Sequence, residues 1–210
     1  MDLSVTGNPG QGNTFSETRL QSAGSYNPNA HEVNHYHYAS AAGSRMDSYF
    51  QSLMQEIESH VKAEVLEELK EYTTKLDGTK DVEEKLTDGG FRPSRIEEAK
   101  RMKEMYAKKA MQYDCYPSAQ KIILYLFAQI KHEFNTSIFP LIEDGESLRT
   151  VMEQLRTKIV KPIMQSLDAN GAHDRYLNFT DDHIYGMIYY LTGMCHLNWK
   201  DYDQDLNPEP

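Results

Sequence analysis

The sequence has little cysteine, no long apolar run and no leader-like N-terminus. Its two cysteines, Cys115 and Cys195, lie far apart and match no disulfide framework or zinc-binding spacing. The longest apolar run, residues 122–130, contains Gln129 and is too short to cross a bilayer. The first residues lack the basic region and apolar core of a signal peptide. We therefore expect a cytoplasmic protein without a membrane partner.

The sequence also lacks an excess of basic residues. Lys and Arg number 22 against 32 Asp and Glu, which gives a net charge of −10. General nucleic-acid binding needs a basic surface, so we expect no direct nucleic-acid partner. Gly7, Gly10 and Gly12 cluster near the start, but no lysine followed by serine or threonine completes a phosphate-binding loop.

Composition divides the chain into three segments. Residues 1–43 are rich in Gly, Asn, Ser, Tyr and His and carry few charges. They are either a disordered tail or an extended segment with short strands, since residues 33–38 alternate as a strand does. Residues 44–203 predict a helical domain, and residues 204–210 form an acidic tail.

Apolar residues recur at helical spacing through the whole middle segment. A stripe with mostly four-residue steps predicts one long amphipathic helix from Ser44 to Leu76, which Asp77-Gly78 ends. We expect an all-α bundle of about five helices. The helix over 118–134 should lie at its centre, because apolar residues cover most of its circumference. The other helices are expected over residues 94–114, 147–167 and 181–199.

Local signals mark where these helices begin and bend. Ser94 and Glu97 match a capping box, and Thr180 is expected to cap the last helix. Pro162 should kink its helix, because it removes a donor and crowds the carbonyl of Lys158.

The stretch from 181 to 199 predicts a surface that protein covers. Gly186 and Gly193 lie seven residues apart and share a helix face, which suggests a neighbouring helix that approaches closely. Its tyrosines and tryptophan each need a partner for a polar atom. We predict an interface here and self-association through the long 44–76 helix. The candidate interface residues are Tyr185, Gly186, Tyr189, Tyr190, Gly193, His196, Trp199, Phe50, Leu53, Ile57, Tyr36 and Tyr38.

The histidines and cysteines do not form a clear reaction centre. Neighbouring helical residues point about 100° apart, so Cys195 and His196 are a poor nucleophile pair. His183 and His196 would lie about 20 Å apart along one helix, too far to share a metal ion. Arg175 and His183 do not match the spacing of a helical ribonuclease motif.

His31, His35 and His37 are the strongest metal-binding candidate. His35 and His37 would project to one face of a strand, but only Glu32 is at hand to complete a ligand set. We expect no catalytic site, no metal and no cofactor.

Two stretches resemble a known family. They are residues 118–122 (SAQKI) with 138–142 (IFPLI), and residues 185–193 (YGMIYYLTG) followed by Cys195, His196 and Trp199. Together they resemble the C-terminal helical domain of proteins in bacterial ABC three-component systems, the group that includes Lamassu-type antiphage defences. The resemblance spans residues 80 to 200. Met194 departs from it, since a small polar residue is expected there.

In that family the domain follows an effector, such as a nuclease or protease, and connects it to an SMC- or ABC-type ATPase and a middle component. Because only 43 residues precede the predicted helices, we expect no effector domain in this chain. The resemblance therefore implies a non-catalytic assembly or sensor subunit of an antiviral complex, which oligomerises and docks to the ATPase, the middle component or the effector. Two alternatives are a phage- or mobile-element-encoded decoy that copies the domain, and a small helical nuclease.

Overall fold

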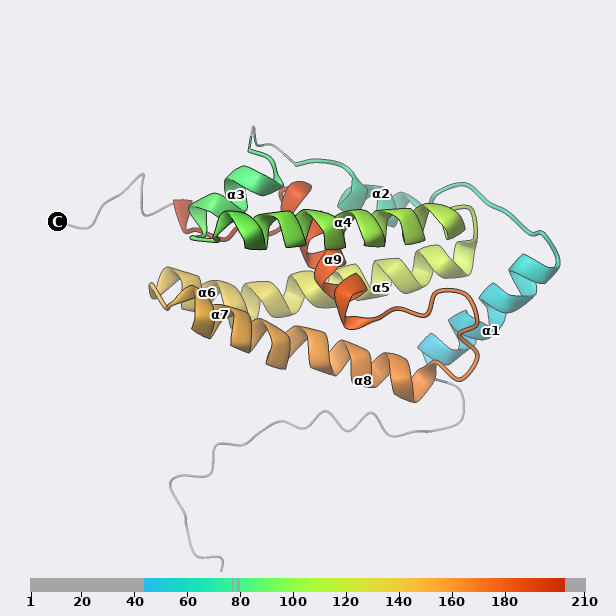
Figure 1. Ribbon diagram of the computed structural model, residues 1–210. Helices are drawn as coiled ribbons and strands as arrows, with labels where there is room; N and C mark the ends of the chain where they lie inside the picture. Colours follow the sequence, from blue (N-terminus) through green and yellow to red (C-terminus); the bar gives the residue numbers. More distant parts are fainter. Residues whose placement is uncertain (1–43, 77, 79, 203–210) are drawn as a thin grey trace, which may run out of the picture. The chain divides into compact units, whose positions relative to one another are not determined.

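The computed structural model of the protein describes residues 44–76, 78 and 80–202 (Figure 1). All regular elements in this part of the chain are helical, which confirms the all-α prediction. The two predicted tails, residues 1–43 and 204–210, lie outside the described residues.

Seven continuous helical stretches follow one another in the described part, against about five expected. Two of them contain a π-helical turn, η1 or η2, between two α-helical parts. The bounds are α1 Arg45–Glu58, α2 Glu67–Thr73, α3 Val82–Asp88, α4 Pro93–Tyr113, α5 Pro117–Glu133 with η1 Phe134–Ile138 and α6 Phe139–Glu143, α7 Leu148–Leu155 with η2 Arg156–Val160 and α8 Lys161–Asn170, and α9 Asp181–Gly193.

The most extensive helix pair is α4 with α9, which cross in Figure 1. Their approach depends on Gly186, where an added Cβ would lie only 2.3 Å from the carbonyl oxygen of Met102. The predicted close neighbour is thus confirmed at Gly186, and it belongs to the same chain. At Gly193 the nearest atom would be Nζ of Lys103, 3.2 Å away on a flexible side chain, so no backbone comes close there.

The core is centred on α5, as predicted. Its side chains Ile122, Phe127 and Ile130 have no exposed surface. Helices α1, α2 and α9 all pack against α5.

Two prolines lie inside continuous helices, each directly after a π-helical turn. The residue before each proline, Phe139 or Lys161, donates its N–H five residues back, to Phe134 or Arg156. The wider turn gives the following proline ring room that an α-helical turn would deny it. The predicted interruption near Pro162 is therefore a π-helical turn, and Pro140 stands in the same setting.

The single helix predicted over residues 44–76 is wrong. Helix α1 ends at Glu58, and His60 then adopts a left-handed φ of +56°. The N–H of Val61 returns to the carbonyl of Glu56, which closes a Schellman turn and ends the helix.

A buried amide from another helix holds the segment between α1 and α2. The Gln120 side chain on α5 accepts a hydrogen bond from the N–H of Leu66 at 2.7 Å. Its amide nitrogen donates to the carbonyls of Glu64 and Asp114 at 3.2 and 2.6 Å. These bonds satisfy backbone groups that would otherwise lack partners outside a helix.

The last helix is shorter than predicted. Helix α9 ends at Gly193, and Cys195 adopts a φ of +65°. The N–H of His196 returns to the carbonyl of Leu191 at 2.9 Å in a second Schellman turn. The chain up to Trp199 then folds back over the bundle as a turn.

One of the two helix starts differs from the prediction. Helix α4 begins at Pro93 with Arg92 as its N-cap, so the predicted capping box of Ser94 and Glu97 is absent. Proline suits the first position because its missing N–H has no helical partner there. Thr180 is the N-cap of α9, as predicted.

Candidate functional site: a hollow beside Trp199

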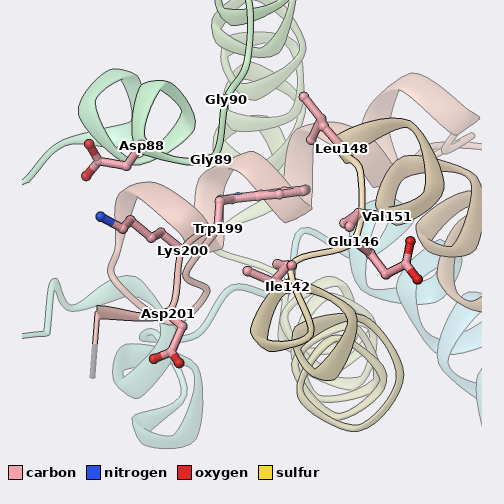
Figure 2. A pocket seen from close by; sticks show the side chains of 11 residues that line it. Asp88, Gly89, Gly90, Ile142, Glu146, Leu148, Val151, Trp199, Lys200 and Asp201 are labelled. Carbon is pink, nitrogen blue, oxygen red and sulfur yellow. The ribbon is translucent and has the colours of Figure 1, made fainter. Parts of the chain in front are cut away.

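A hollow of about 340 Å³ opens where three separate segments meet (Figure 2). Residues 88–90 at the end of α3 form one wall, residues 142–151 around the α6–α7 turn form another, and residues 199–201 form the third. In Figure 2 the indole of Trp199 extends across the hollow toward Leu148. No sequence pattern predicts this site, because the residues of its three walls are far apart in the sequence.

The indole of Trp199 is fixed in place by buried neighbours. Its Nε1–H donates to the hydroxyl of Thr192 at 3.0 Å, and that hydroxyl donates to the carbonyl of Ile188 at 3.0 Å. Phe91 and Phe134 meet the ring edge to face, with centroids at 4.9 and 5.3 Å. Only 3% of Trp199 is exposed, so the hollow has a rigid aromatic wall.

Three glycines, Gly89, Gly90 and Gly145, also line the hollow. A Cβ at Gly89 would lie 2.6 Å from Cβ of Trp199, so the two backbones are in close contact. Gly90 and Gly145 have φ values of +79° and +71°, and each closes the turn after a helix. A Cβ at either position would meet no atom within 4 Å, so both face open space.

Carboxylates are more numerous than amines around the hollow. Asp88, Glu146 and Asp201 line it, together with Lys200. Figure 2 shows the carboxylates turned toward its outer edges. The hydrogen bond from Lys80, followed by that from Tyr202, lowers the pKa of Asp88, so this edge stays ionised near neutral pH.

The turn that carries Trp199 is tied to α3 and to the segment before it. Lys85 is 4% exposed, and its ammonium donates to the Asn198 side chain at 2.8 Å. Burial lowers the pKa of Lys85. The N–H of Leu76 donates to the carbonyl of Met194 at 3.1 Å. These ties hold the wall of the hollow in one position.

Cys195 and His196, the candidate nucleophile pair, contact different parts of the fold. The Cys195 sulfur lies 4.0 Å from the carbonyl oxygen of Lys80, whereas the His196 ring packs on Tyr72 with centroids 5.4 Å apart. Neither ring nitrogen of His196 has a well-aligned hydrogen-bond partner among the described residues.

His183 has a role at the start of α9. Its Nδ1 lies 3.2 Å from the backbone nitrogen of Thr180 and 2.8 Å from the Thr180 hydroxyl. Burial lowers the pKa of His183, which favours the neutral ring that this cap requires as an acceptor. Arg175 is exposed in the loop before α9.

Within residues 44–76, 78 and 80–202, no three His, Cys, Asp or Glu side chains gather closely enough to hold a metal ion. The candidate set His31, His35 and His37 lies outside this range. In the same part of the chain, no helix has the length and apolar character needed to cross a membrane.

Six of the ten predicted interface residues that the structure describes are buried inside the fold. Helix α1 contributes Phe50 and Leu53 to the core, and Ile57 packs at its edge. Buried side chains reach a partner only if the fold opens, so an interface through them stays a prediction. The buried candidates are Phe50, Leu53, Gly186, Tyr189, His196 and Trp199. The partly exposed candidates are Ile57, Tyr185, Tyr190 and Gly193. Tyr36 and Tyr38 lie outside the described residues.

Apolar side chains remain exposed on the segment that joins α1 to α3. Val61, Val65 and Leu76 are 51%, 41% and 44% exposed, and all three belong to the stripe that predicted a long helix. The break at His60 interrupts this stripe, whose later member Leu69 on α2 is buried again. Met111 on α4 is exposed as well, at 72%.

The family comparison matches the part of the chain that contains α3 to α9. The model of C-terminal domain 9 of the ABC-three component (ABC-3C) systems matches residues 81–199. The chain belongs to this family. The resemblance predicted from sequence is thereby confirmed at the level of ABC-3C systems, and the Lamassu-type subgroup stays a prediction. No curated protein and no solved structure matches the chain.

The family motifs coincide with contacts that hold this domain together. In the SAQKI stretch, buried Ser118 and Gln120 form hydrogen bonds with Glu56 and Leu66, which precede the matched region. In the second stretch, Gly186 allows the backbone of α4 to approach closely, and Thr192 accepts the hydrogen bond of the Trp199 indole. The Trp199 hollow is thus built from residues of the matched region and the two residues after it.

Proposed function

We propose that this chain is a non-catalytic assembly or sensor subunit of a bacterial antiviral defence complex. Membership of an ABC-3C family suggests a role in a defence system. The chain would act by associating with itself and by docking to an ATPase, a middle component or an effector.

This proposal is carried by the observation that the histidines and the cysteine of the last segment make structural contacts. His183 caps a helix, His196 is buried beneath Tyr72, and Cys195 closes a turn. The surface instead offers a preformed hollow and exposed apolar residues, which are features that protein partners recognise.

Co-expression with the genes next to its own tests the docking part. A scaffold should co-purify with an ATPase or middle component, and alanine variants of His35, His37 and His183 should keep both the complex and its activity. An enzyme would lose activity in such a variant while the complex stays intact. Failure of the wild-type chain to co-purify with any neighbouring product would overturn the docking proposal.

Self-association is tested separately, through the exposed apolar segment. We expect light scattering at micromolar concentration to show an oligomer, which the double variant Val61→Asp and Val65→Asp weakens. The control is Met111→Asp, which places a single aspartate at an exposed apolar residue outside that segment. A strictly monomeric wild-type protein would rule out the oligomer.

A further inference from the structure

The Trp199 hollow has the properties of a site that is ready to bind. The indole is held by one hydrogen bond and two edge-to-face rings, and Gly89 packs directly on its Cβ. Little side-chain ordering is needed when a ligand enters such a site, so more of the contact energy appears as affinity.

The size of the hollow limits what can occupy it. A volume of about 340 Å³ accommodates a few side chains and lies at the low end for small-molecule sites, which span roughly 300–1,000 Å³. Its walls combine the aliphatic side chains Ile142, Leu148 and Val151 with glycine backbone and outward carboxylates. An apolar stem with a polar end matches this combination.

The charged residues around the hollow determine whether the polar end of a ligand is positive or negative. Three carboxylates line the hollow together with the single ammonium of Lys200, and Lys80 pairs with one of the three, Asp88, which leaves Glu146 and Asp201 as the remaining negative charges. The α6–α7 turn adds Glu143 and Asp144, so it carries three carboxylates within four residues. An anionic ligand would be repelled, whereas a cation would be attracted.

Among cationic side chains, arginine suits the site better than lysine. The guanidinium group is more weakly hydrated than an ammonium and can bond two oxygens of a carboxylate at once. Its stem can lie on apolar surface while its charged head stays at the rim.

We propose that the Trp199 hollow binds an arginine side chain, with an adjacent apolar residue, from an extended segment of a partner protein. This inference rests on the proposed docking function and names the chemistry of the docked segment. The apolar residue lies against Ile142 and Leu148, which are half-buried, and the guanidinium reaches the carboxylate of Glu146.

Trp199 is the only tryptophan of the chain, so its fluorescence reports directly on the hollow. The probe is a six-residue peptide without aromatic residues, in which arginine and leucine residues alternate. It is titrated into the full chain, with a second peptide carrying glutamates in place of the arginines. We expect a saturable change in Trp199 emission with the arginine peptide alone.

Two charge reversals on the α6–α7 region provide the variant test. Glu146→Lys should weaken binding of the arginine peptide by about fivefold or more, since a rim charge is lost and reversed. Glu153→Lys makes the same change at an exposed position of α7 away from the hollow, and should stay within about twofold of wild type.

Several results would overturn the inference. They are no saturable emission change at millimolar peptide, equal binding of the glutamate peptide, equal loss in both variants, or binding of free arginine amide as tight as that of the peptide. The last result would indicate a small-molecule site. If wild type co-purifies with a neighbouring gene product and Glu146→Lys does so equally well, the docking proposal survives and this inference fails.

Discussion

The carboxylate of Glu56 on α1 caps the N-terminus of α5 through Ser118. One oxygen accepts the backbone N–H of Ser118 at 3.0 Å, and the other accepts its hydroxyl at 2.6 Å. Helix α5 has no capping side chain from its own preceding residue, so this cap comes from 62 residues earlier in the chain.

Replacing this cap should destabilise the fold. We expect Glu56→Ala to lower the free energy of unfolding by about 1–2 kcal/mol, because two donors at a helix start lose their acceptor. Urea denaturation followed by circular dichroism measures the change. Glu58→Ala, an exposed position two residues on, should change it by less than about 0.5 kcal/mol. Equal losses in both variants would contradict the capping role.

Thr192 should matter for the position of the indole. Thr192→Val keeps the shape of the side chain but leaves the buried Nε1–H of Trp199 without an acceptor. The expected cost is about 1–3 kcal/mol of unfolding free energy, accompanied by a changed near-ultraviolet circular dichroism signal of Trp199. The control is Thr157→Val, an exposed threonine with the same bond to its own helix backbone. If the two valine variants behave alike, the buried hydrogen bond does not hold the ring.

The two glycines of α9 should respond differently to alanine. Gly186→Ala places a Cβ against the backbone of α4 and should cost about 1–3 kcal/mol through overpacking. Gly193→Ala meets the flexible end of the Lys103 side chain at 3.2 Å and Cβ of Val82 at an ordinary contact distance of 3.6 Å. The better helix propensity of alanine should therefore leave stability unchanged or raise it by up to about 1 kcal/mol. Thermal denaturation of the two single variants compares them. A larger loss at Gly193 would contradict the packing described for α4 and α9.

Stability should fall as the pH is lowered through the range of the buried histidines. Burial, with a smaller contribution from Lys131, lowers the pKa of His196 below its ordinary value of 6.5, although the backbones of Glu71 and Tyr72 oppose the shift. The unfolded chain then binds the proton more readily than the folded chain. Free energy of unfolding is therefore lost as the pH falls below 6.5, until the folded pKa is reached.

The variant His196→Phe tests this assignment, since it keeps an aromatic ring beside Tyr72 and removes the titrating group. Denaturation at pH 7.5 and at lower pH, roughly down to 5.5, should show a smaller loss than in wild type. His183 contributes in the same direction, because burial also lowers its pKa, so some loss remains. His132→Phe, at an exposed position, should keep the wild-type slope. An unchanged slope in His196→Phe would assign the pH dependence to other groups.

Local signals were sufficient to predict three helical stretches of the matched region, whereas its last helix ends earlier than expected. Prolines at the starts of α4 and α5 and continuous apolar periodicity mark them clearly, so α4, α5 and the α7–α8 stretch lie within a few residues of the prediction. The break after α1 was missed because apolar residues keep their four-residue spacing through it. What ends the helix is a left-handed His60 and a long-range bond from Gln120, and neither is visible in a local pattern.

The Trp199 hollow could not be predicted from the sequence. Aromatic residues of the last segment were assigned to an interface because each needed a polar partner, but Trp199 finds its partner in Thr192 of the same chain. The hollow beside Trp199 exists only because the ends of α3 and α6 lie next to it. A hollow assembled from three turns has no periodicity of its own.

The unit defined by family membership and the unit that folds do not coincide. The match begins at residue 81, yet Phe50 and Leu53 of α1 are buried in the same core as α5. A fragment cut at residue 81 would leave that core uncovered and α5 without its cap from Glu56. Because α1 packs on α5 and caps it through Glu56, any displacement of the chain at Ser44 would act directly on the central helix.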